Sequence, residues 1–268
     1  MRDVGIKNLS AINITQPFGM WDSFTSVTEV PLIVGINSNE GEMFVHGAFP
    51  IMMHKYVYWG FVMALFKKSA PKVLNQYGYH ADQCKVSGDY RPVMSMIIHD
   101  YLFRCPLLKI VQTLQDRRIL KKDSLNLPIY VYEFSHPTSV PDFPICSGIA
   151  CHTAELPYVF EQIEEIGKYF TASKKVDGTA SLADIKVSQT LAEYWVSFAK
   201  NHDPNFSNNT LYWPNWLGQD ALIKKDYKEI NHDFLISDDK FNEKAYIILK
   251  ENLEVHNWKF DCSCFFLE

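Results

Sequence analysis

Short apolar runs alternate with longer amphipathic stretches along this chain. Val30–Ile36 and Pro128–Phe134 are rich in β-branched and aromatic residues, and each predicts a buried strand. About a hundred residues between them have helical patterning, which includes helices predicted over 56–68, 92–103 and 106–120. Strands that alternate with helices favour an α/β fold with a mostly parallel sheet and packed helices.

The most clearly marked helix follows Ser181. Ser181 and Asp184 have the spacing of a capping box, in which each residue satisfies a backbone N–H of the other. Apolar residues then recur on one helical face: Val187, Leu191, Trp195 and Phe198. We expect this helix to end near Asn201–Pro204, because the residue before a proline disfavours helical backbone angles.

Weaker patterns follow in the last part of the chain. They predict a polar and aromatic loop over 206–216, a pair of short strands within 221–236 and a final helix over 241–258. No internal repeat, low-complexity tract or linker interrupts the sequence, which favours one continuous unit over residues 1–268.

Composition limits the classes of function. Hydrophobic residues make up 47% of the 268 residues and aromatic residues 14%, which is typical of a globular core. The net charge of −5 argues against a nucleic-acid-binding surface. The longest nearly uncharged apolar run, Tyr56–Phe66, is shorter than the roughly 20 residues of a membrane span, so we expect a buried helix there.

An acidic residue and a histidine occupy positions that suggest acid–base chemistry. Glu40 directly follows the first predicted strand, and His152 lies in a loop before a predicted helix. An acid followed by a histidine is the second half of the serine-hydrolase order Ser, Asp/Glu, His. In that order Glu40 would orient the imidazole and His152 would be the general base. From the single residues alone we would favour the ordinary interpretation, in which Glu40 is a polar strand-end residue and His152 is a histidine that is satisfied near a helix start.

Five ordered segments resemble the type B carboxylesterase/cholinesterase family of the α/β-hydrolase fold. Val30–Gly41 resembles the segment with the catalytic acid, and His152–Phe160 resembles the segment with the catalytic histidine. The other three matching segments are Asp100-x4-Cys105-Pro106, Ile129–Phe134, and Leu191–Asn205 followed by Trp213-Pro214. The resemblance covers nearly the whole chain and implies the C-terminal portion of an α/β-hydrolase.

The resemblance also implies an activity. Family members hydrolyse small carboxylic esters through an acyl-enzyme, without a cofactor or a metal ion. Met43 and Phe44 match positions that line the substrate pocket, although ordinary core packing explains such residues equally well. Glu155 could orient the histidine loop or cap the following helix, and we favour the cap.

Two departures from the family pattern stand out. The family usually has glycine directly after the histidine, whereas this chain has Thr153, whose Cβ could crowd the acyl pocket or shift the loop. The Gly-x-Ser-x-Gly turn of the nucleophile and the glycine-rich oxyanion loop are absent from these 268 residues. We therefore expect a C-terminal half that is inactive alone and poorly folded, because the strand at Val30–Ile36 would leave an edge unpaired.

The alternative hypothesis is a non-catalytic module. Some members of the family are adhesion or partner-binding domains on the same fold, and the missing serine is compatible with such a role. The chain could also dock onto a separately made N-terminal half. Retention of both Glu40 and His152 favours the esterase ancestry over the adhesion alternative.

Cysteines and glycosylation motifs suggest a secretory design. Four Asn-x-Ser/Thr motifs begin at Asn8, Asn13, Asn205 and Asn208. By the family resemblance Cys105 would pair with Cys264, which fits slightly better than Cys262. Residues 1–30 contain no apolar signal-peptide core, so the chain would stay in the cytoplasm if it were expressed in this form.

The remaining cysteines lie close to the histidine. Cys146 and Cys151 precede His152, but their spacing is not that of a common zinc module, so we predict no metal site. Cys151 is also a poor substitute nucleophile, because adjacent side chains usually diverge.

Overall fold

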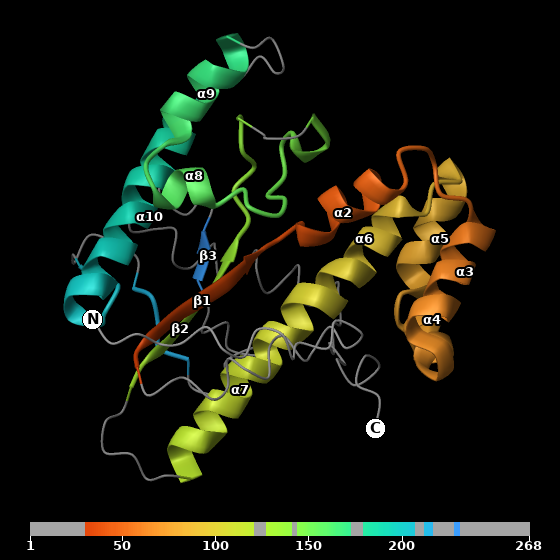
Figure 1. The fold of residues 1–268 in the computed structure, drawn as a ribbon, viewed down its shortest axis with the longest axis horizontal. Helices are drawn as coiled ribbons and strands as arrows, with labels where there is room; N and C mark the ends of the chain where they lie inside the picture. Colours follow the sequence, from red (N-terminus) through yellow and green to blue (C-terminus); the bar gives the residue numbers. More distant parts are fainter. Residues whose placement is uncertain are drawn as a thin grey trace, which may run out of the picture.

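The structure of this chain is a computed structural model, which describes residues 30–120, 127–140, 144–172, 179–206, 212–216 and 228–230 (Figure 1). Its strands are β1 (Leu32–Asn37), β2 (Ile129–Phe134) and β3 (Lys228–Ile230). Its helices are α2 (Glu40–Ala48), α3 (Lys55–Phe66), α4 (Ala70–Gln76), α5 (Gly78–Ser87), α6 (Arg91–His99), α7 (Cys105–Leu120), α8 (Leu156–Val159), α9 (Ile163–Ala172) and α10 (Leu182–Asn201). Single helical turns are η3 (Lys67–Ser69), the π-helical η4 (Asp100–Arg104) and η5 (Pro144–Cys146).

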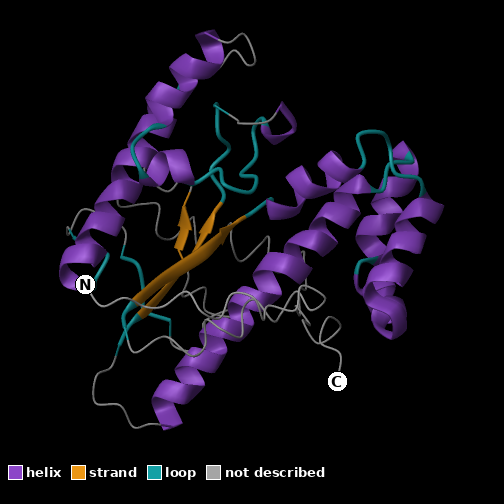
Figure 2. Ribbon diagram, viewed as in Figure 1, coloured by secondary structure: helices purple, strands orange, loops and turns teal. Residues whose placement is uncertain are grey.

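The three strands form a parallel sheet in the order β1-β2-β3 (Figure 2). Leu32 lies opposite Ile129, and Gly35 lies opposite Tyr132. A Cβ at Gly35 would come within 2.3 Å of the Tyr132 ring, so the glycine lets this ring lie flat across β1. Parallel strands place their carboxyl ends at one edge, which brings the segments after β1 and β2 together.

Helices cover both faces of the sheet. Side chains of α7 and the sheet form one apolar cluster: Leu107, Ile110, Val111 and Leu114 with Ile36, Ile129 and Val131. The alternate positions of β2 face α10 and pack on aromatic residues: Tyr130 and Tyr132 with Tyr194, Trp195 and Trp213. This alternation along β2 buries both faces and gives a three-layer α/β/α arrangement.

Helices α2 to α6 form a helical lobe to one side of the sheet (Figure 1). Its own core includes Tyr58, Val62, Tyr77, Tyr90 and Met94. Helix α6 continues through η4 into α7, which spans the sheet, so the lobe and the sheet are joined by a nearly unbroken helical path. Gly41 at the start of α2 allows a close approach to α6, because a Cβ there would lie 1.9 Å from the Ser95 carbonyl oxygen.

Most predicted elements are confirmed within the described residues. Both strands are present, and α10 begins with the expected capping box, in which Ser181 Oγ accepts from the Asp184 N–H and the Asp184 carboxylate accepts from the Ser181 N–H. It ends at Asn201, as expected. Of the strand pair predicted within 221–236, the structure describes β3, and the helix predicted over 241–258 lies outside the described residues.

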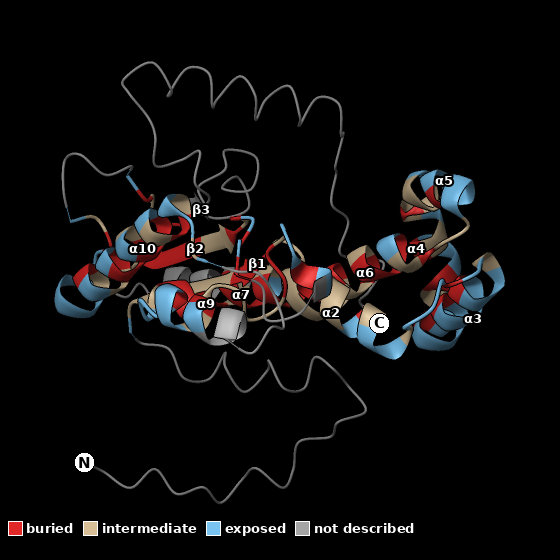
Figure 3. Cartoon of the chain, turned by 90° about the horizontal axis from the view of Figure 1, so that it is seen from above, coloured by how far each residue is buried: buried red, intermediate tan, exposed pale blue. Residues whose placement is uncertain are grey.

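The expectation that the run Tyr56–Phe66 is a buried helix is wrong. The helix α3 forms there, but only Tyr58, Val62 and Phe66 are buried, at a spacing of four residues. Tyr56 and Met63, on the rest of its circumference, are 81% and 51% exposed. Figure 3 shows α3 with both buried and exposed residues along its length. High hydrophobicity predicted burial, whereas the lobe covers only one stripe of the helix.

Candidate active site

The acid Glu40 lies where β1 ends and α2 begins. Its side chain is buried, and its Oε1 accepts a hydrogen bond of 2.7 Å from the backbone N–H of Asn37. Glu40 is the first residue of α2, where the helix dipole favours a negative charge. The close contact at Gly41 holds this turn against α6, so the carboxylate has a fixed position at the carboxyl edge of the sheet.

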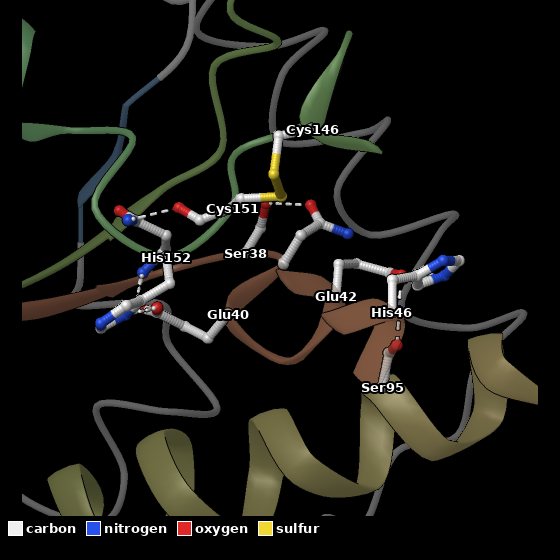
Figure 4. The surroundings of a disulfide bond; sticks show 10 residues. Ser38, Glu40, Glu42, His46, Ser95, Cys146, Cys151 and His152 are labelled. Atoms are coloured by element: carbon white, nitrogen blue, oxygen red, sulfur yellow. Dashed lines mark hydrogen bonds and ion pairs between the residues drawn. A yellow bond between two sulfur atoms is a disulfide. The ribbon is translucent and has the colours of Figure 1, made fainter. Parts of the chain in front are cut away.

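The loop with His152 follows β2 and is tied down at several points. A disulfide joins Cys146 to Cys151, directly before the histidine (Figure 4). The Asn37 side-chain Nδ2 donates to the Cys151 carbonyl oxygen at 2.8 Å, and the Asn39 N–H donates to the Ala150 carbonyl oxygen at 2.9 Å. The segment after β1 therefore pairs with the histidine loop as an extension of the sheet.

This arrangement brings the two predicted residues together, although 112 positions separate them. His152 Nδ1 lies 2.6 Å from Glu40 Oε2. Because an ionised carboxylate only accepts hydrogen bonds, we assign the ring proton to Nδ1. The hydrogen bond from His152 to Glu40 raises the pKa of His152, against the opposing effect of burial.

The two side chains differ in exposure. The imidazole side chain of His152 is 35% exposed, whereas that of Glu40 is 6% exposed. With Nδ1 bonded to the carboxylate, Nε2 is the free basic nitrogen, and none of the described side chains forms a hydrogen bond with it. The geometry is that of a general base held in one tautomer by a buried acid.

Asn37 and Glu155 complete the polar contacts of the site. Asn37 is buried, and its Nδ2 also donates to Glu155 Oε2 at 2.5 Å. Glu155 occupies the N-cap position of α8, as expected, but its side chain makes no capping hydrogen bond there. It faces Asn37 instead, and burial raises its pKa. Asn37 was missed at the sequence level, where a lone asparagine after a strand predicts only a turn.

Two phenyl rings flank the imidazole. The ring centroids of Phe44 and Phe103 lie 5.1 Å and 5.2 Å from that of His152, and the two rings stack on each other at 5.8 Å. Phe44 is a predicted pocket residue and is 40% exposed, so it forms an apolar wall beside the base. Met43, the other predicted pocket residue, is half-buried at the preceding position of α2. Phe103 gave no sequence signal, because it belongs to the π-helical turn η4.

The backbone is strained at Thr153, where the family usually has glycine. Its φ is +71°, in the left-handed region where glycine is favoured and a β-branched residue is strained. The pairing of His152 with Glu40 is retained despite this strain.

Of the other predicted site residues, the structure describes Cys105 and Asn205. Cys105 is buried and disulfide-bonded, while its predicted partner Cys264 lies outside the described residues. Asn205 uses its amide nitrogen as a donor to Asp203 Oδ1 and the Trp213 carbonyl oxygen, so a glycan on this nitrogen would remove one of its two N–H donors. The predicted glycosylation sites Asn8, Asn13 and Asn208 are outside the described part of the chain.

The described residues form neither a metal site nor a membrane-spanning helix. In the part of the chain that the structure describes, no group of three or more His, Cys, Asp or Glu side chains could hold a metal ion. The Cys146 and Cys151 thiols are joined to each other. None of the described helices is both long and apolar enough to span a bilayer.

Comparison with known proteins assigns the family. A model of the Carboxylesterase family matches residues 10–245. The Crystal protein of Dictyostelium discoideum is 29% identical over 207 residues, which cover 75% of this chain and 33% of that protein. A medium-chain fatty acyl-CoA hydrolase precursor of Anas platyrhynchos is 36% identical over 104 residues, which cover 37% of this chain and 16% of that protein.

A solved structure agrees with the fold. A thermophilic PNB esterase superposes with a TM-score of 0.52 at 17% identity, covering 81% of this chain and 37% of that one. The chain spans about a third of the length of the curated relatives that it matches. The match to the family model extends over both β1 with Glu40 and the loop with His152. This chain belongs to the carboxylesterase family.

Proposed function

We propose that this chain supplies the acid and the base of a Ser-Glu-His triad for carboxylic ester hydrolysis. The observation that supports this role is the 2.6 Å contact between His152 Nδ1 and the buried Glu40 carboxylate. Membership of the carboxylesterase family gives the pair its reaction class. The intact pair also favours a hydrolase over the alternative of a non-catalytic interaction module.

The proposed roles follow from the geometry. His152 Nε2 accepts the proton of a serine hydroxyl while the serine oxygen bonds to the ester carbonyl carbon. The resulting imidazolium is stabilised by Glu40, whose carboxylate is held in position by a hydrogen bond from the Asn37 N–H. The same proton then passes to the departing alcohol, and the acyl-enzyme is hydrolysed by the same steps with water.

In this proposal, the serine and the oxyanion donors come from outside these 268 residues. The sequence contains no Gly-x-Ser-x-Gly turn. Without a serine, the base has no nucleophile to activate. Without N–H donors, the oxyanion of the transition state lacks what is usually the largest electrostatic stabilisation. We therefore propose that this chain alone does not hydrolyse esters and acts with a segment that bears the nucleophile.

The walls of the site suggest the substrate class and the compartment. Phe44 and Phe103 place apolar surface beside the base, which suits an ester with an apolar acyl or alcohol group. The reaction needs no cofactor. The Cys146–Cys151 disulfide and the disulfide-bonded Cys105 favour an oxidising compartment, in line with a secreted or luminal protein.

A fluorophosphonate probe tests the proposal, because it labels only an activated serine. The purified 268-residue chain should not be labelled. A longer product that includes a nucleophile turn should be labelled, and His152→Gln in that product should abolish labelling while Glu193→Gln, on the exposed face of α10, should not. Labelling of the short chain, or His152-independent labelling of the long one, would contradict the proposal.

A further inference from the structure

Helix α3 exposes an apolar surface that the fold does not use. Its buried stripe, Tyr58, Val62 and Phe66, packs into the core of the lobe. The side chains around the rest of the helix and in the segment before it are apolar and exposed by 43% to 81%: Ile51, Met52, Tyr56, Trp59, Phe61 and Met63. We call these six residues the α3 face. Exposed apolar side chains in this number are typical of an interaction site.

The charge around the α3 face is one-sided. From Met43 to Ala81 the sequence contains no aspartate and no glutamate, although the whole chain has a net charge of −5. Four lysines lie in the same segment: Lys55, Lys67, Lys68 and Lys72. Lys55 Nζ lies 4.4 Å from the centre of the Trp59 ring, so positive charge and aromatic surface share one side of the helix.

We propose that the α3 face binds the surface of an anionic lipid bilayer. Tryptophan and tyrosine favour the headgroup region, lysines favour anionic headgroups, and the apolar side chains can enter the acyl boundary. The 12 residues of α3 span about 18 Å, less than the roughly 30 Å of a hydrocarbon core, so the helix lies in the interface rather than crossing it.

The aspartates near the α3 face, Asp82 and Asp89, are each paired with a cation. Asp89 accepts from the Met53 N–H and forms an ion pair of 2.7 Å with Arg91. Asp82 lines a groove beside Trp59, but it forms an ion pair of 2.6 Å with Lys85, and the two charges cancel. Helix α3 lies to one side of the sheet (Figure 1), whereas Glu40 and His152 belong to the segments that follow β1 and β2. Binding to lipid therefore stands or falls independently of the proposed esterase role.

Vesicle binding of the full 268-residue chain tests the proposal. At about 50 mM salt the chain should sediment with vesicles of phosphatidylcholine and phosphatidylserine, but not with phosphatidylcholine alone, and raising the salt should weaken binding because exposed charges are screened. Lys67→Gln with Lys68→Gln should weaken it roughly 30-fold, since each lysine near an anionic surface contributes about fivefold. The matched control, Lys186→Gln with Lys200→Gln on α10, should bind like the wild type.

A second set of variants tests the apolar contact. Tyr56→Ser, Trp59→Ser and Met63→Ser together should abolish sedimentation, whereas Val86→Ser, at a position on α5 that is 96% exposed, should not. Brominated lipid should quench tryptophan fluorescence in the wild type and much less in Trp59→Phe. Failure to bind anionic vesicles, equal loss in the control variants, or self-association of the chain that protects Trp59 would each overturn the proposal.

Discussion

Two histidine–carboxylate pairs in this chain have similar geometry and opposite surroundings. His152 lies 2.6 Å from Glu40, and His136 lies 2.9 Å from Asp184. The His152 side chain is 35% exposed, whereas that of His136 is 2% exposed. Both pairs join segments far apart in sequence, so the distance alone does not separate the pair that we propose to be catalytic from the enclosed one.

The carboxylates show the difference most clearly. Glu40 accepts one further hydrogen bond, from a backbone N–H. Asp184 accepts from the hydroxyls of Tyr158, Ser139 and Ser181 as well as from the Ser181 N–H. Although burial alone would raise the pKa of Asp184, these hydrogen bonds and that of His136 hold it far below its usual range.

The enclosed pair also supports the loop with His152. Asp184 belongs to the capping box of α10 and, through Tyr158, holds α8, which directly follows the histidine loop. The enclosed pair supports the scaffold, whereas the pair with one open nitrogen is the one that we propose to be catalytic.

The largest expected effect comes from breaking the enclosed pair. Asp184→Ala should lower the free energy of unfolding by about 3–5 kcal/mol, because it leaves buried donors unpaired. Glu40→Ala should cost less, since its imidazole partner can reach water. Urea unfolding measures both, with Glu193→Gln on the exposed face of α10 as the control. Equal losses of stability for Asp184→Ala and Glu40→Ala would contradict the distinction between the enclosed pair and the partly exposed pair.

Acidification should also separate the two pairs. A carboxylate whose pKa is lowered in the folded state adds stability above its unfolded pKa and loses that stability as the pH falls toward the folded value. The wild type should therefore lose stability steadily below about pH 4, whereas Asp184→Asn should show a flatter acid limb. Thermal unfolding from about pH 6 to about pH 2.5 measures the slopes, and identical slopes would contradict this role of Asp184.

Removing the disulfide should have an intermediate effect that reaches the reactive pair. Cys146→Ser with Cys151→Ser should cost about 2 kcal/mol in the chain-entropy model for so short a loop. It should also increase hydrogen exchange in the loop with His152 while leaving α10 protected. A variant of the buried free cysteine, Cys84→Ala, controls for thiol removal elsewhere. Unchanged hydrogen exchange near His152 would contradict this prediction, because it would show that the hydrogen bonds from Asn37 and Asn39 are enough to hold the loop.

The smallest effect concerns the strained residue beside the base. Thr153→Gly should raise the free energy of unfolding by about 1 kcal/mol, because glycine adopts a positive φ without strain. Thr190→Gly, in the interior of α10, should instead destabilise. Urea unfolding measures both variants, and a loss of stability at Thr153 would show that its side chain makes compensating contacts.

Sequence patterns were sufficient for features that depend on local order. The capping box of α10, the two strands, and Glu40 and His152 all follow from short motifs. Asn37 could not be found in this way, because its role depends on meeting Cys151 and Glu155, more than a hundred positions away. The Cys146–Cys151 disulfide was likewise missed, since a pair of cysteines does not specify its pairing.

Two helical features required the tertiary structure. Helix α2 was not predicted, because Gly41 and Gly47 lower its helical propensity, whereas the packing of Gly41 on Ser95 favours it. The exposure of α3 was missed because hydrophobicity alone predicts burial. The mismatch between pattern and burial is itself what identifies the α3 face.

The pairing of Glu40 with His152 is tested most directly by ¹⁵N NMR of the histidine side chains. In the wild type, His152 should have its proton on Nδ1 and a pKa above the usual value, so the stability from this pair is full at low pH and is lost as the pH rises through the folded pKa. Glu40→Gln should lower the pKa of His152, whereas Glu42→Gln, on the same turn, should leave it nearly unchanged. An equal pKa of His152 in the wild type and in Glu40→Gln would contradict the account.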